Sequence, residues 1–503
     1  MYLDRLLILS VFAVASCGLA YELIAGALAS YLLGDSVMQF SSIIGAYLFA
    51  MGVGSHLSKY VKDEDVISRF IEIELLVGLI GGLSATVLFL TFAHASTPFR
   101  SVMYALVFVV GVLVGMEIPL VMRIFNARKA AFSDIVSRVL TFDYLGALAV
   151  SLVFPLVLAP KLGLSRSALL FGLANAGVAL VTAWAFRAEL PKLRALMSRG
   201  VCVTVLLLAG FASAERLVAW SEKSLFGDEI IYSMTSQYQR LVVTRWKGDM
   251  RLHINGNLQF SSKDEHRYHE ALVHPVMASL PWAKHVLVMG GGDGLAVREI
   301  LKYKNVETIT LVDLDPEMTK LFTTAPELVA LNRGSLLDPR VKVINSDAAQ
   351  WLETADKVYD AIIVDFPDPT NFALGKLYSV PFYRLMKKHM AENGLAVIQA
   401  TSPYFGPRSY WTVDATLKEV GYKTAPYHAY VPSFGDWGFI LCSNKGYKLP
   451  DKYTVPLKWL DASTTRLMFD FPADMAPLKM APNYLNSQSL VHAFEEDWAK
   501  VIR

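Results

Sequence analysis

Seven long apolar segments near the N-terminus constrain this chain more than any other feature of its sequence. A helix of roughly 20 apolar residues can cross the hydrocarbon layer of a bilayer. The segments that meet this measure are 6–33, 36–57, 70–93, 102–122, 142–158, 164–186 and 200–217. The first is too long for the apolar core of a cleavable signal peptide, and further segments follow it. The sequence therefore predicts an α-helical multi-pass domain over residues 1–220, with about seven transmembrane helices, in the cell (inner) membrane.

Charged residues are concentrated in the rest of the chain. Residues 1–220 hold 16 Lys or Arg and 13 Asp or Glu, whereas the whole chain of 503 residues holds 47 and 45. Residues 221–503 therefore have the composition of a water-soluble, catalytic-sized region. The net charge of +2, without a basic stripe, gives no electrostatic footprint for nucleic acid. Cys17, Cys202 and Cys442 are too scattered for a disulfide framework or a metal cluster, so no metal site is predicted.

The distribution of Lys and Arg between short loops predicts an orientation, because these residues are enriched in the loops on the cytoplasmic side. One set of loops carries Lys59, Lys62, Arg69, Arg123, Arg128, Lys129, Arg138, Arg187, Lys192, Arg194 and Arg199, and the other carries Arg100, Lys161 and Arg166. With seven crossings, the soluble half would then lie outside the cell. If the short seventh segment lies in the membrane interface instead, the soluble half is cytoplasmic, and the chemistry below favours that side.

Three acidic residues, Glu22, Glu117 and Asp143, fall at or near membrane depth. A charge at the centre of a membrane helix costs at least about 2.5 kcal/mol, so such residues usually face the interior of a helix bundle. Two interpretations stay open. The acids form a cation path or a polyamine site between helices, or they are protonated or capped and hold helices together.

Beyond the membrane segments, strand and helix patterns alternate. Residues 221–262 predict a small antiparallel β-hairpin subdomain, and residues 451–503 predict a C-terminal tail with two short helices. Between them, residues 263–450 predict a Rossmann-like, doubly wound sheet of the type found in S-adenosylmethionine-dependent transferases. Its main strands are expected at 285–289, 308–313, 341–344, 361–365 and 395–400. The predicted fold class is an α-helical multi-pass membrane domain followed by an α/β domain.

A glycine-rich turn, Gly290-Gly291-Gly292-Asp293-Gly294, follows the first of these strands. Glycines permit a tight turn and close approach of the backbone to a nucleoside, and an acid at the end of the next strand can bind ribose hydroxyls. Asp313 occupies that position. The G-x-G-x-G spacing favours an S-adenosyl ligand over a dinucleotide.

Two further acids, Asp365 and Asp368, follow the fourth strand. Ligands of doubly wound sheets bind outside the carboxyl ends of the strands, so these acids are expected to share one acidic pocket with Asp293 and Asp313, which would select a cationic substrate. An alkylamine with a pKa of about 10.4 is neutral in only about one molecule in 2,500 at pH 7. One carboxylate that accepts the ammonium proton and a second that positions the amine would supply what attack requires. Asp365 and Asp368 fit these roles.

Taken together, residues 236–443 resemble the spermidine synthase family of polyamine aminopropyltransferases, in its membrane-fused bacterial form. The motifs that carry the resemblance are Ser236-Gln237-Tyr238-Gln239, Asn255-Gly256 with Gln259, Asp264-Glu265, Tyr268-His269-Glu270, the Gly290 turn, Asp313, Asp347, the D-x-x-D-P at Asp365 and Trp437-Gly438-Phe439. The resemblance implies transfer of an aminopropyl group to putrescine or a related amine, giving spermidine and methylthioadenosine. It also implies decarboxylated S-adenosylmethionine as co-substrate, without a prosthetic group.

The same resemblance implies roles for individual residues. Those implied to bind the nucleoside co-substrate are Gln239, His269, Gly290, Gly292, Asp293, Asp313, Asp347 and Ala348. Tyr268, Asp293 and Asp368 are implied to bind the amine, and Asp365 to accept its proton. The expected partners are small-molecule polyamine and nucleoside substrates and the lipid bilayer, with no nucleic acid, and a homo-oligomer is left open.

The sequence departs from the family pattern in two loops at the acceptor end. Phe372, in the run 370–378, stands where a proline is expected, and the segment 432–436 is shortened. Two alternative functions therefore remain, a polyamine transporter or sensor with a ligand-binding domain and a small-molecule methyltransferase. The second is disfavoured because Asp293 would repel the carboxylate of S-adenosylmethionine.

Overall fold

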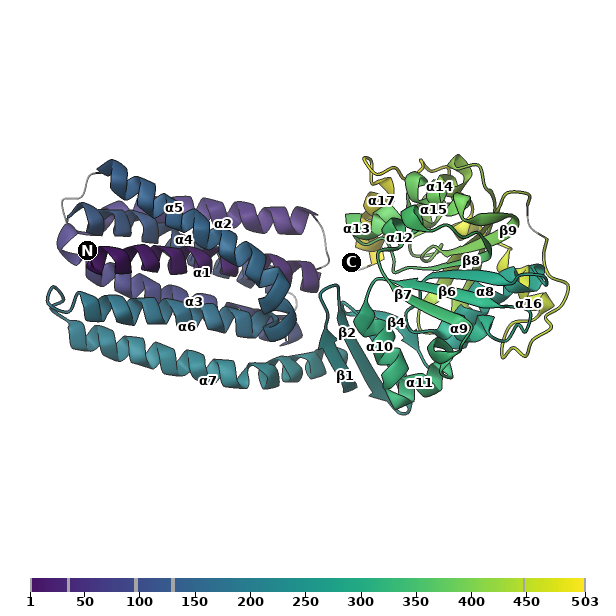
Figure 1. Ribbon diagram of the computed structural model, residues 1–503, viewed down its shortest axis with the longest axis horizontal. Helices are drawn as coiled ribbons and strands as arrows, with labels where there is room; N and C mark the ends of the chain where they lie inside the picture. The colour runs from purple at the N-terminus through teal and green to yellow at the C-terminus, as the bar shows by residue number, and fades with distance from the viewer. Residues whose placement is uncertain (1, 34–36, 95–97, 128–131, 447, 502–503) are drawn as a thin grey trace. The chain divides into compact units, whose positions relative to one another are not determined.

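The computed structural model describes residues 2–33, 37–94, 98–127, 132–446 and 448–501 and divides into two compact units, Met1–Ile230 and Ile231–Arg503. Ser36, where the second predicted span begins, and Arg128 and Lys129, which entered the orientation argument, lie outside the described residues. The first unit is helical and the second is mixed α/β (Figure 1).

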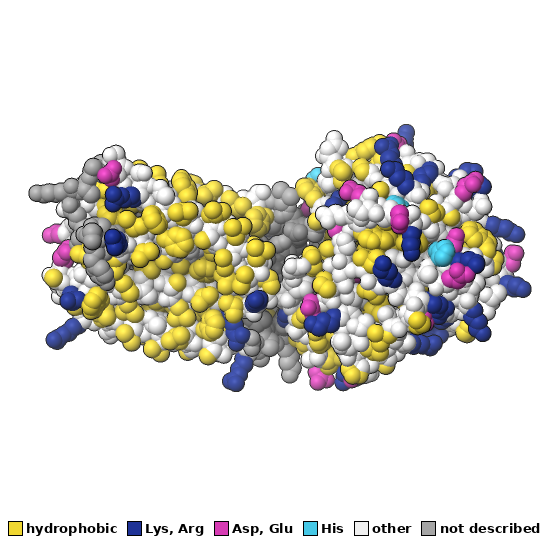
Figure 2. All heavy atoms as spheres, viewed as in Figure 1, with side chains coloured by type: hydrophobic (Ala, Val, Ile, Leu, Met, Phe, Trp, Pro, Cys, Tyr) yellow, Lys and Arg dark blue, Asp and Glu magenta, His cyan; other side chains and the backbone are white. Residues whose placement is uncertain are grey.

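The helical unit is built from long, apolar α-helices. They are α1 (Tyr2–Leu33), α2 (Val37–Leu57), α3 (Val66–His94), α4 (Phe99–Asn126), α5 (Phe132–Val153), α6 (Ala159–Ala185) and α7 (Leu193–Phe226). Large apolar side chains such as Leu48, Phe49 and Leu156 are also exposed on the outside of the unit. Figure 2 shows a broad hydrophobic surface on this unit, with charged side chains gathered toward the ends of the helices. Exposed apolar side chains gathered in this way are typical of surfaces that contact a membrane or another protein.

Within the described residues, six helical stretches of this unit are long and apolar enough to cross a membrane, and they overlap all seven predicted spans. The predicted fifth and sixth spans fall within one continuous stretch, Ser133–Ala185. Helical hydrogen bonding continues from α5 through a π-helical turn, Phe154–Leu158, into α6, and only Gly163, with φ of 72°, leaves the helical region. The two predicted spans are therefore separated by a kink at Gly163 and not by a break in the helical bonding.

The second unit begins with a small four-stranded sheet in the order β1-β2-β3-β4. Its strands are β1 (Glu229–Thr235), β2 (Arg240–Trp246), β3 (Asp249–Ile254) and β4 (Asn257–Ser261). The turns between them hold Lys247-Gly248 and Asn255-Gly256, all with positive φ, as tight hairpin turns require.

A seven-stranded sheet follows, in the order β10-β11-β9-β8-β5-β6-β7. Its strands are β5 (His285–Gly290), β6 (Thr308–Asp313), β7 (Val341–Asn345), β8 (Tyr359–Asp365), β9 (Met390–Gln399), β10 (Lys423–Val431) and β11 (Gly435–Ser443). The first five are parallel, whereas β11 is antiparallel to β9 and β10 to β11. The order reverses between β5 and β8, so the sheet has the predicted doubly wound form.

Alternate side chains of each strand pack into two separate cores, because successive residues of a strand point to opposite faces. Val286 and Val288 belong to one core, and Leu287 and Met289 belong to the other. The first core is covered by α8 (Glu265–Ser279), α9 (Leu295–Ile300), α10 (Pro316–Thr324) and α11 (Pro326–Asn332). The second is covered by α12 (Ala348–Thr354), α14 (Val380–Lys388), α15 (Pro407–Glu419) and α17 (Ser489–Val501).

The C-terminal region forms the two predicted short helices, α16 (Ala462–Met468) and α17, but it is integrated into the unit more closely than a polar tail. The Glu270 carboxylate accepts hydrogen bonds from the backbone N–H groups of residues 458–460 at 2.7–3.0 Å. Leu460 and Leu490 are buried in the two cores. The region therefore stabilises the sheet from both faces.

Candidate active site

The site lies where the strand order reverses, at the carboxyl ends of β5 and β8. Gly290, the last residue of β5, is paired in register with Asp365, the last residue of β8. The two strands are parallel, but the connections that follow them run to opposite sides of this point, and ligands of doubly wound sheets bind in the crevice between such loops.

The glycine turn brings the backbone against two acidic residues. A Cβ atom at Gly290 would lie 2.2 Å from the backbone oxygen of Asp365, and one at Gly292 would lie 2.7 Å from the carboxyl carbon of Asp313. Gly290 also has φ of 78°, a conformation that other residues rarely adopt. The sequence Gly-Gly-Gly is therefore what allows β5, β6 and β8 to present their acids to one crevice.

Asp313 and Asp293 are fixed by backbone donors. The Asp313 carboxylate accepts hydrogen bonds from the N–H groups of Gly292 at 3.0 Å and Asp315 at 2.9 Å. The Asp293 carboxylate accepts one from the N–H of Leu295 at 2.9 Å. Burial raises the pKa of Asp313 to about 6 and also raises the pKa of Asp293. Each carboxylate is thus held in one orientation, and because burial disfavours its charge, a bound cation would stabilise it.

Asp365 is paired with the hydroxyl group of Tyr268 from α8, which donates to Oδ1 at 2.6 Å. The other oxygen, Oδ2, faces the glycine turn, where a Cβ atom at Gly291 would lie 3.1 Å from it. Burial, with a further contribution from the negative charge of Asp293, raises the pKa of Asp365 to about 6, although His269 opposes the shift. The result is an oriented carboxylate that is more basic than a free aspartate.

Asp368 is held by two residues of β9 and its extension that the sequence reasoning did not identify. Gln399 Nε2 donates to Oδ1 at 3.2 Å, and Thr401 Oγ1 donates to Oδ2 at 3.0 Å. Trp437 Nε1 in turn donates to Gln399 Oε1 at 3.1 Å. Burial raises the pKa of Asp368 to about 6. The one feature of the sequence that could have identified these two residues is their position, since Gln399 and Thr401 also lie at the carboxyl end of a parallel strand.

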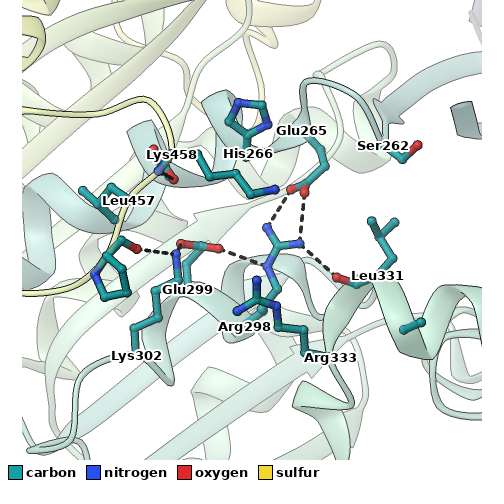
Figure 3. Close-up of a pocket in the computed structure, with 13 residues that line it drawn as sticks. Ser262, Glu265, His266, Arg298, Glu299, Lys302, Leu331, Arg333, Leu457 and Lys458 are labelled. Atoms are coloured by element: carbon teal, nitrogen blue, oxygen red, sulfur yellow. Dashed lines mark hydrogen bonds and ion pairs between the residues drawn. The ribbon is translucent and has the colours of Figure 1, made fainter.

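His269 is oriented by a buried ion-pair network on α8 and α9. Its Nδ1 lies 2.8 Å from the backbone oxygen of Glu265 and 2.9 Å from Glu265 Oε2, so Nδ1 carries the hydrogen. Arg298 binds the same carboxylate through both terminal nitrogens at 2.8 and 3.0 Å (Figure 3). Although burial opposes both shifts, the pKa of Glu265 falls to about 2 and that of His269 rises.

The cavity drawn in Figure 3 lies behind this network and is separate from the crevice. Its volume is about 360 Å³, and it is lined by Glu265, Arg298, Glu299, Lys302 and neighbouring residues. None of Asp293, Asp313, Asp365 and Asp368 lines it. Instead, the cavity is bordered by Glu265 and Arg298, which orient His269.

The remaining predicted nucleoside ligands lie on neighbouring elements. Asp347 caps α12 by accepting from the N–H of Ala349 at 2.9 Å, and Lys376 Nζ binds its other oxygen at 2.6 Å. Burial acts against ionisation of Asp347, but Lys376 and the backbone donors outweigh it and keep its pKa low. Ala348 is buried as the first residue of α12.

Gln239 reaches the same region through the turn before β2. Its N–H donates to Ser236 Oγ at 3.0 Å, and that hydroxyl donates to Asp315 at 2.7 Å. Since the N–H of Asp315 binds Asp313, this turn is tied to the acidic end of β6.

The two unusual loops are both packed in place. Phe372, the first residue of α13 (Phe372–Gly375), meets the ring of His492 on α17 at 6.1 Å. In the shortened segment, Ser433 donates to Asp264 through its N–H and its hydroxyl group at 2.7 and 2.9 Å. Phe434 lies 6.3 Å from the ring of Tyr268. Phe434 is therefore an apolar wall beside Tyr268, at the position where the sequence offered no equivalent tyrosine.

The crevice thus joins four aspartates, a tyrosine and a glycine turn. Within the described residues, no group of three His, Cys, Asp or Glu side chains is arranged to hold a metal ion. The chemistry that this set can perform is recognition of positive charge and acceptance of a proton.

Comparison with known proteins places this arrangement in a family. The family described as "Spermine/spermidine synthase domain" matches residues 265–453. "Polyamine aminopropyltransferase 2" of Ralstonia nicotianae is 66% identical over 99% of both chains. "Polyamine aminopropyltransferase" of Leptospira interrogans is 48% identical over 99% of both chains. Because these matches span the full length, the relatives share both units. A solved spermidine synthase in complex with the transition state analogue AdoDATO matches 48% of this chain and 86% of its own, with 25% identity and a TM-score of 0.46.

Proposed function

The chain belongs to the spermine/spermidine synthase family and is a polyamine aminopropyltransferase, and from that premise we propose that it uses the four-aspartate crevice to join decarboxylated S-adenosylmethionine to putrescine or a related diamine. The observation that carries this proposal is the meeting of Asp293, Asp313, Asp365 and Asp368 around one strand reversal. Both substrates are multiply positive, so a crevice of this charge favours binding them together.

The amine end of the site is formed by Tyr268, Asp365 and Asp368. In the transfer, the amine nitrogen forms a bond to the carbon next to sulfur while the carbon–sulfur bond breaks, and neutral methylthioadenosine leaves. The ammonium proton passes to Asp365, whose Oδ1 is anchored by Tyr268. Asp368, anchored by Gln399 and Thr401, holds the amine in line. Positioning of this kind and general base catalysis act together.

The pKa values indicate how the proton is removed. With the pKa of Asp365 at about 6 and that of an alkylammonium near 10.4, the transfer costs roughly 6 kcal/mol. The positive sulfonium, brought within about 4 Å of the amine, repels the ammonium by roughly 4 kcal/mol at the dielectric of a protein surface. Most of the cost is thus offset by bringing the two substrates together. A base with the ordinary pKa of aspartate would face a cost about 3 kcal/mol larger.

The nucleoside end is formed by the glycine turn, Asp313, Asp347 and His269. Asp313 and Asp347 are suited to accept hydrogen bonds from ribose and adenine groups, and Asp293 to bind the aminopropyl ammonium. The carboxylate of intact S-adenosylmethionine would be repelled by Asp293, which favours aminopropyl over methyl transfer.

An acceptor panel tests this proposal. Detergent-purified protein is incubated with decarboxylated S-adenosylmethionine and with putrescine, cadaverine or spermidine, and methylthioadenosine release is measured. We expect release with the diamines, and none when S-adenosylmethionine replaces the donor. Release with spermidine alone would reject the diamine acceptor, and methyl transfer from S-adenosylmethionine would reject the assignment of Asp293.

We further propose that the helical unit spans the cell membrane and that the catalytic unit faces the cytoplasm, where its nucleoside co-substrate is made. The exposed apolar surface of the helical unit and its six long apolar stretches support insertion. The distribution of Lys and Arg between the loops, combined with seven membrane crossings, predicts instead that the catalytic unit lies outside the cell. A reporter experiment decides between the two sides. A reporter fused after Arg503 that is active only outside the cell would reject the cytoplasmic assignment.

A further inference from the structure

The helical unit encloses two carboxyl groups that the aminopropyl transfer does not use. Glu74 on α3 and Glu117 on α4 are 0% and 1% exposed, and the two groups are close enough to interact directly. Of the three acids that the sequence singled out in this region, only Glu117 is enclosed, whereas Glu22 and Asp143 are partly exposed. Glu74 is a fourth acid that the sequence reasoning missed.

No described residue compensates the charge of this pair. The two carboxyl groups share a side-chain hydrogen bond with each other, and no other described residue donates to either oxygen of Glu74 or to Oε1 of Glu117. The titratable groups around the pair are Cys17 and Tyr21 on α1, Tyr47 on α2 and Asp143 on α5, and none of them is basic. An ionised carboxylate without a partner costs many kcal/mol in such a place, so the pair must hold protons or a cation.

Other unpartnered polar groups line the same place. The hydroxyl group of Tyr21 is buried, lies within electrostatic range of both carboxyls and has no partner among the described residues. The side chain of Asn175 on α6 is fully buried, and neither its amide nitrogen nor its amide oxygen is paired within the described part of the chain. Its Cβ lies 3.2 Å from the ideal Cβ position of Gly78, one turn after Glu74.

We propose that Glu74 and Glu117 form a cation-exchange site. The site binds protons when no polyamine is present and exchanges them for the ammonium group of a polyamine, so that the helical unit is a proton-coupled polyamine carrier. This inference rests on the proposed membrane insertion and on the polyamine product of the catalytic unit. A pair of carboxyls beside a tyrosine hydroxyl is also the group that surrounds the amine position in the catalytic unit, at Asp365, Asp368 and Tyr268. One chain would then make a polyamine and move it across the membrane in which it sits.

The test uses the full chain reconstituted in vesicles of phosphatidylethanolamine and phosphatidylglycerol, with a pH-sensitive dye inside and labelled spermidine outside. We expect spermidine entry accompanied by alkalinisation of the lumen, as protons leave in exchange. Glu74→Gln and Glu117→Gln should each slow the exchange at least about tenfold, since removal of a buried partner charge usually costs more than 1.4 kcal/mol. The matched control is Glu72→Gln, two residues away on α3, where the carboxylate faces Arg69 and Arg199. This variant should exchange at the normal rate.

A measurement on the unmodified chain covers the case in which a variant fails to fold. An apolar carbodiimide reacts with protonated carboxyl groups inside membranes, so mass spectrometry should find Glu74 or Glu117 labelled, and spermidine should reduce the labelling. Absence of exchange, proton movement without spermidine, or labelling that ignores spermidine would overturn the inference.

Methylthioadenosine release is measured in the same vesicles with both substrates outside. Release without exchange rejects the carrier and leaves the aminopropyl transfer intact. Exchange without release rejects the proposed chemistry of the crevice and leaves the carrier intact.

Discussion

The two units of this chain both gather acidic side chains in an enclosed place, but they treat them in opposite ways. In the catalytic unit each of the four crevice aspartates has a donor, for example Tyr268 for Asp365 and the backbone of Gly292 for Asp313. In the helical unit, the one described hydrogen-bond partner of Glu74 is a second carboxyl group, that of Glu117. A carboxylate with donors is held ionised and aimed, whereas a carboxyl without donors must take up a proton or a cation.

This difference explains what each arrangement suits. The crevice keeps its aspartates oriented before substrate arrives, which is what a fast, specific reaction with a cationic substrate requires. The acid pair of the helical unit is not preorganised for chemistry, and its state depends on what occupies it. The predictions below test the two sides of this contrast, beginning with the largest expected effect.

Replacement of Asp365 by asparagine keeps the shape of the site and removes the proton acceptor. We expect kcat/KM for methylthioadenosine release to fall about 10³-fold, within the range usual for loss of a general base. The matched control is Asp360→Asn, at the opposite end of β8, where the carboxylate binds the N–H groups of Lys284 and His285. A loss below tenfold in Asp365→Asn would show that another group takes the proton.

Replacement of Asp293 by asparagine tests recognition rather than proton transfer. Loss of a close charge pair usually costs 2–3 kcal/mol, so we expect kcat/KM for the decarboxylated donor to fall about 100-fold. Inhibition by intact S-adenosylmethionine should become stronger at the same time, because the repulsion of its carboxylate is gone. Unchanged inhibition would place the aminopropyl group away from Asp293.

Much of this crevice could be predicted from the sequence, because strand ends obey a simple rule. Apolar runs located β5, β6 and β8, and the carboxyl ends of parallel strands meet at one edge, so Asp313 and Asp365 had to lie near the glycine turn. Gln399 and Thr401 follow the same rule, but polar residues at a strand end also occur on ordinary surfaces. Their role as donors to Asp368 depends on side-chain directions that spacing alone does not fix.

Glu74 shows a different limit. It lies two residues after Glu72 at the start of an apolar stretch, where a pair of acids is typical of a membrane surface. Helical geometry places the two side chains about 200° apart, so both cannot face the same surroundings. That signal could have separated the exposed Glu72 from the buried Glu74. Hydropathy has a related limit, since it does not show the helical bonding through Pro155 that joins the predicted fifth and sixth spans.

The acids of the crevice should make the substrate-free protein more stable at pH 5 than at pH 7. Asp313, Asp365 and Asp368 have pKa values of about 6, above the value near 3.9 of the unfolded chain. Their contribution to stability is complete below the unfolded pKa and is lost as the pH rises through the folded pKa. Over this interval we expect about 1 kcal/mol for each carboxyl.

Burial lowers the pKa of His266 and of His274, and these two groups oppose the trend. The low pKa of Glu265, about 2, stabilises the fold above pH 4.5 and is lost only in more acidic solution. The raised pKa of His269 acts in the same direction as the aspartates. Thermal melts of the catalytic unit's transition in the full chain provide the measurement, and Asp365→Asn with Asp368→Asn should remove most of the pH effect. A melting temperature that rises between pH 5 and pH 7 would contradict the assigned pKa values.

Lys376 tests whether the unusual loop 370–376 contributes to binding. Its ion pair with Asp347 is partly exposed, with the lysine side chain 39% accessible, so loss of the pair is worth at most about 1 kcal/mol. We expect Lys376→Ala to raise KM for the nucleoside donor up to about fivefold, with kcat little changed. An equal fall in kcat and in kcat/KM would instead show that the loop acts in the transition state.

The smallest effect is expected at Glu74, and it separates the two units most sharply. Glutamine has the shape of a protonated glutamate and can keep a hydrogen bond to Glu117 when it replaces Glu74. Glu74→Gln should therefore change the stability of the helical unit by less than about 0.5 kcal/mol. Asp368→Ala, by contrast, leaves the hydroxyl of Thr401 without its acceptor, which costs about 1–3 kcal/mol. Thermal melts of both variants in one detergent give the comparison. If Glu74→Gln is the more damaging change, Glu74 is a structural anchor, and the contrast between donor-held and donor-free acids fails.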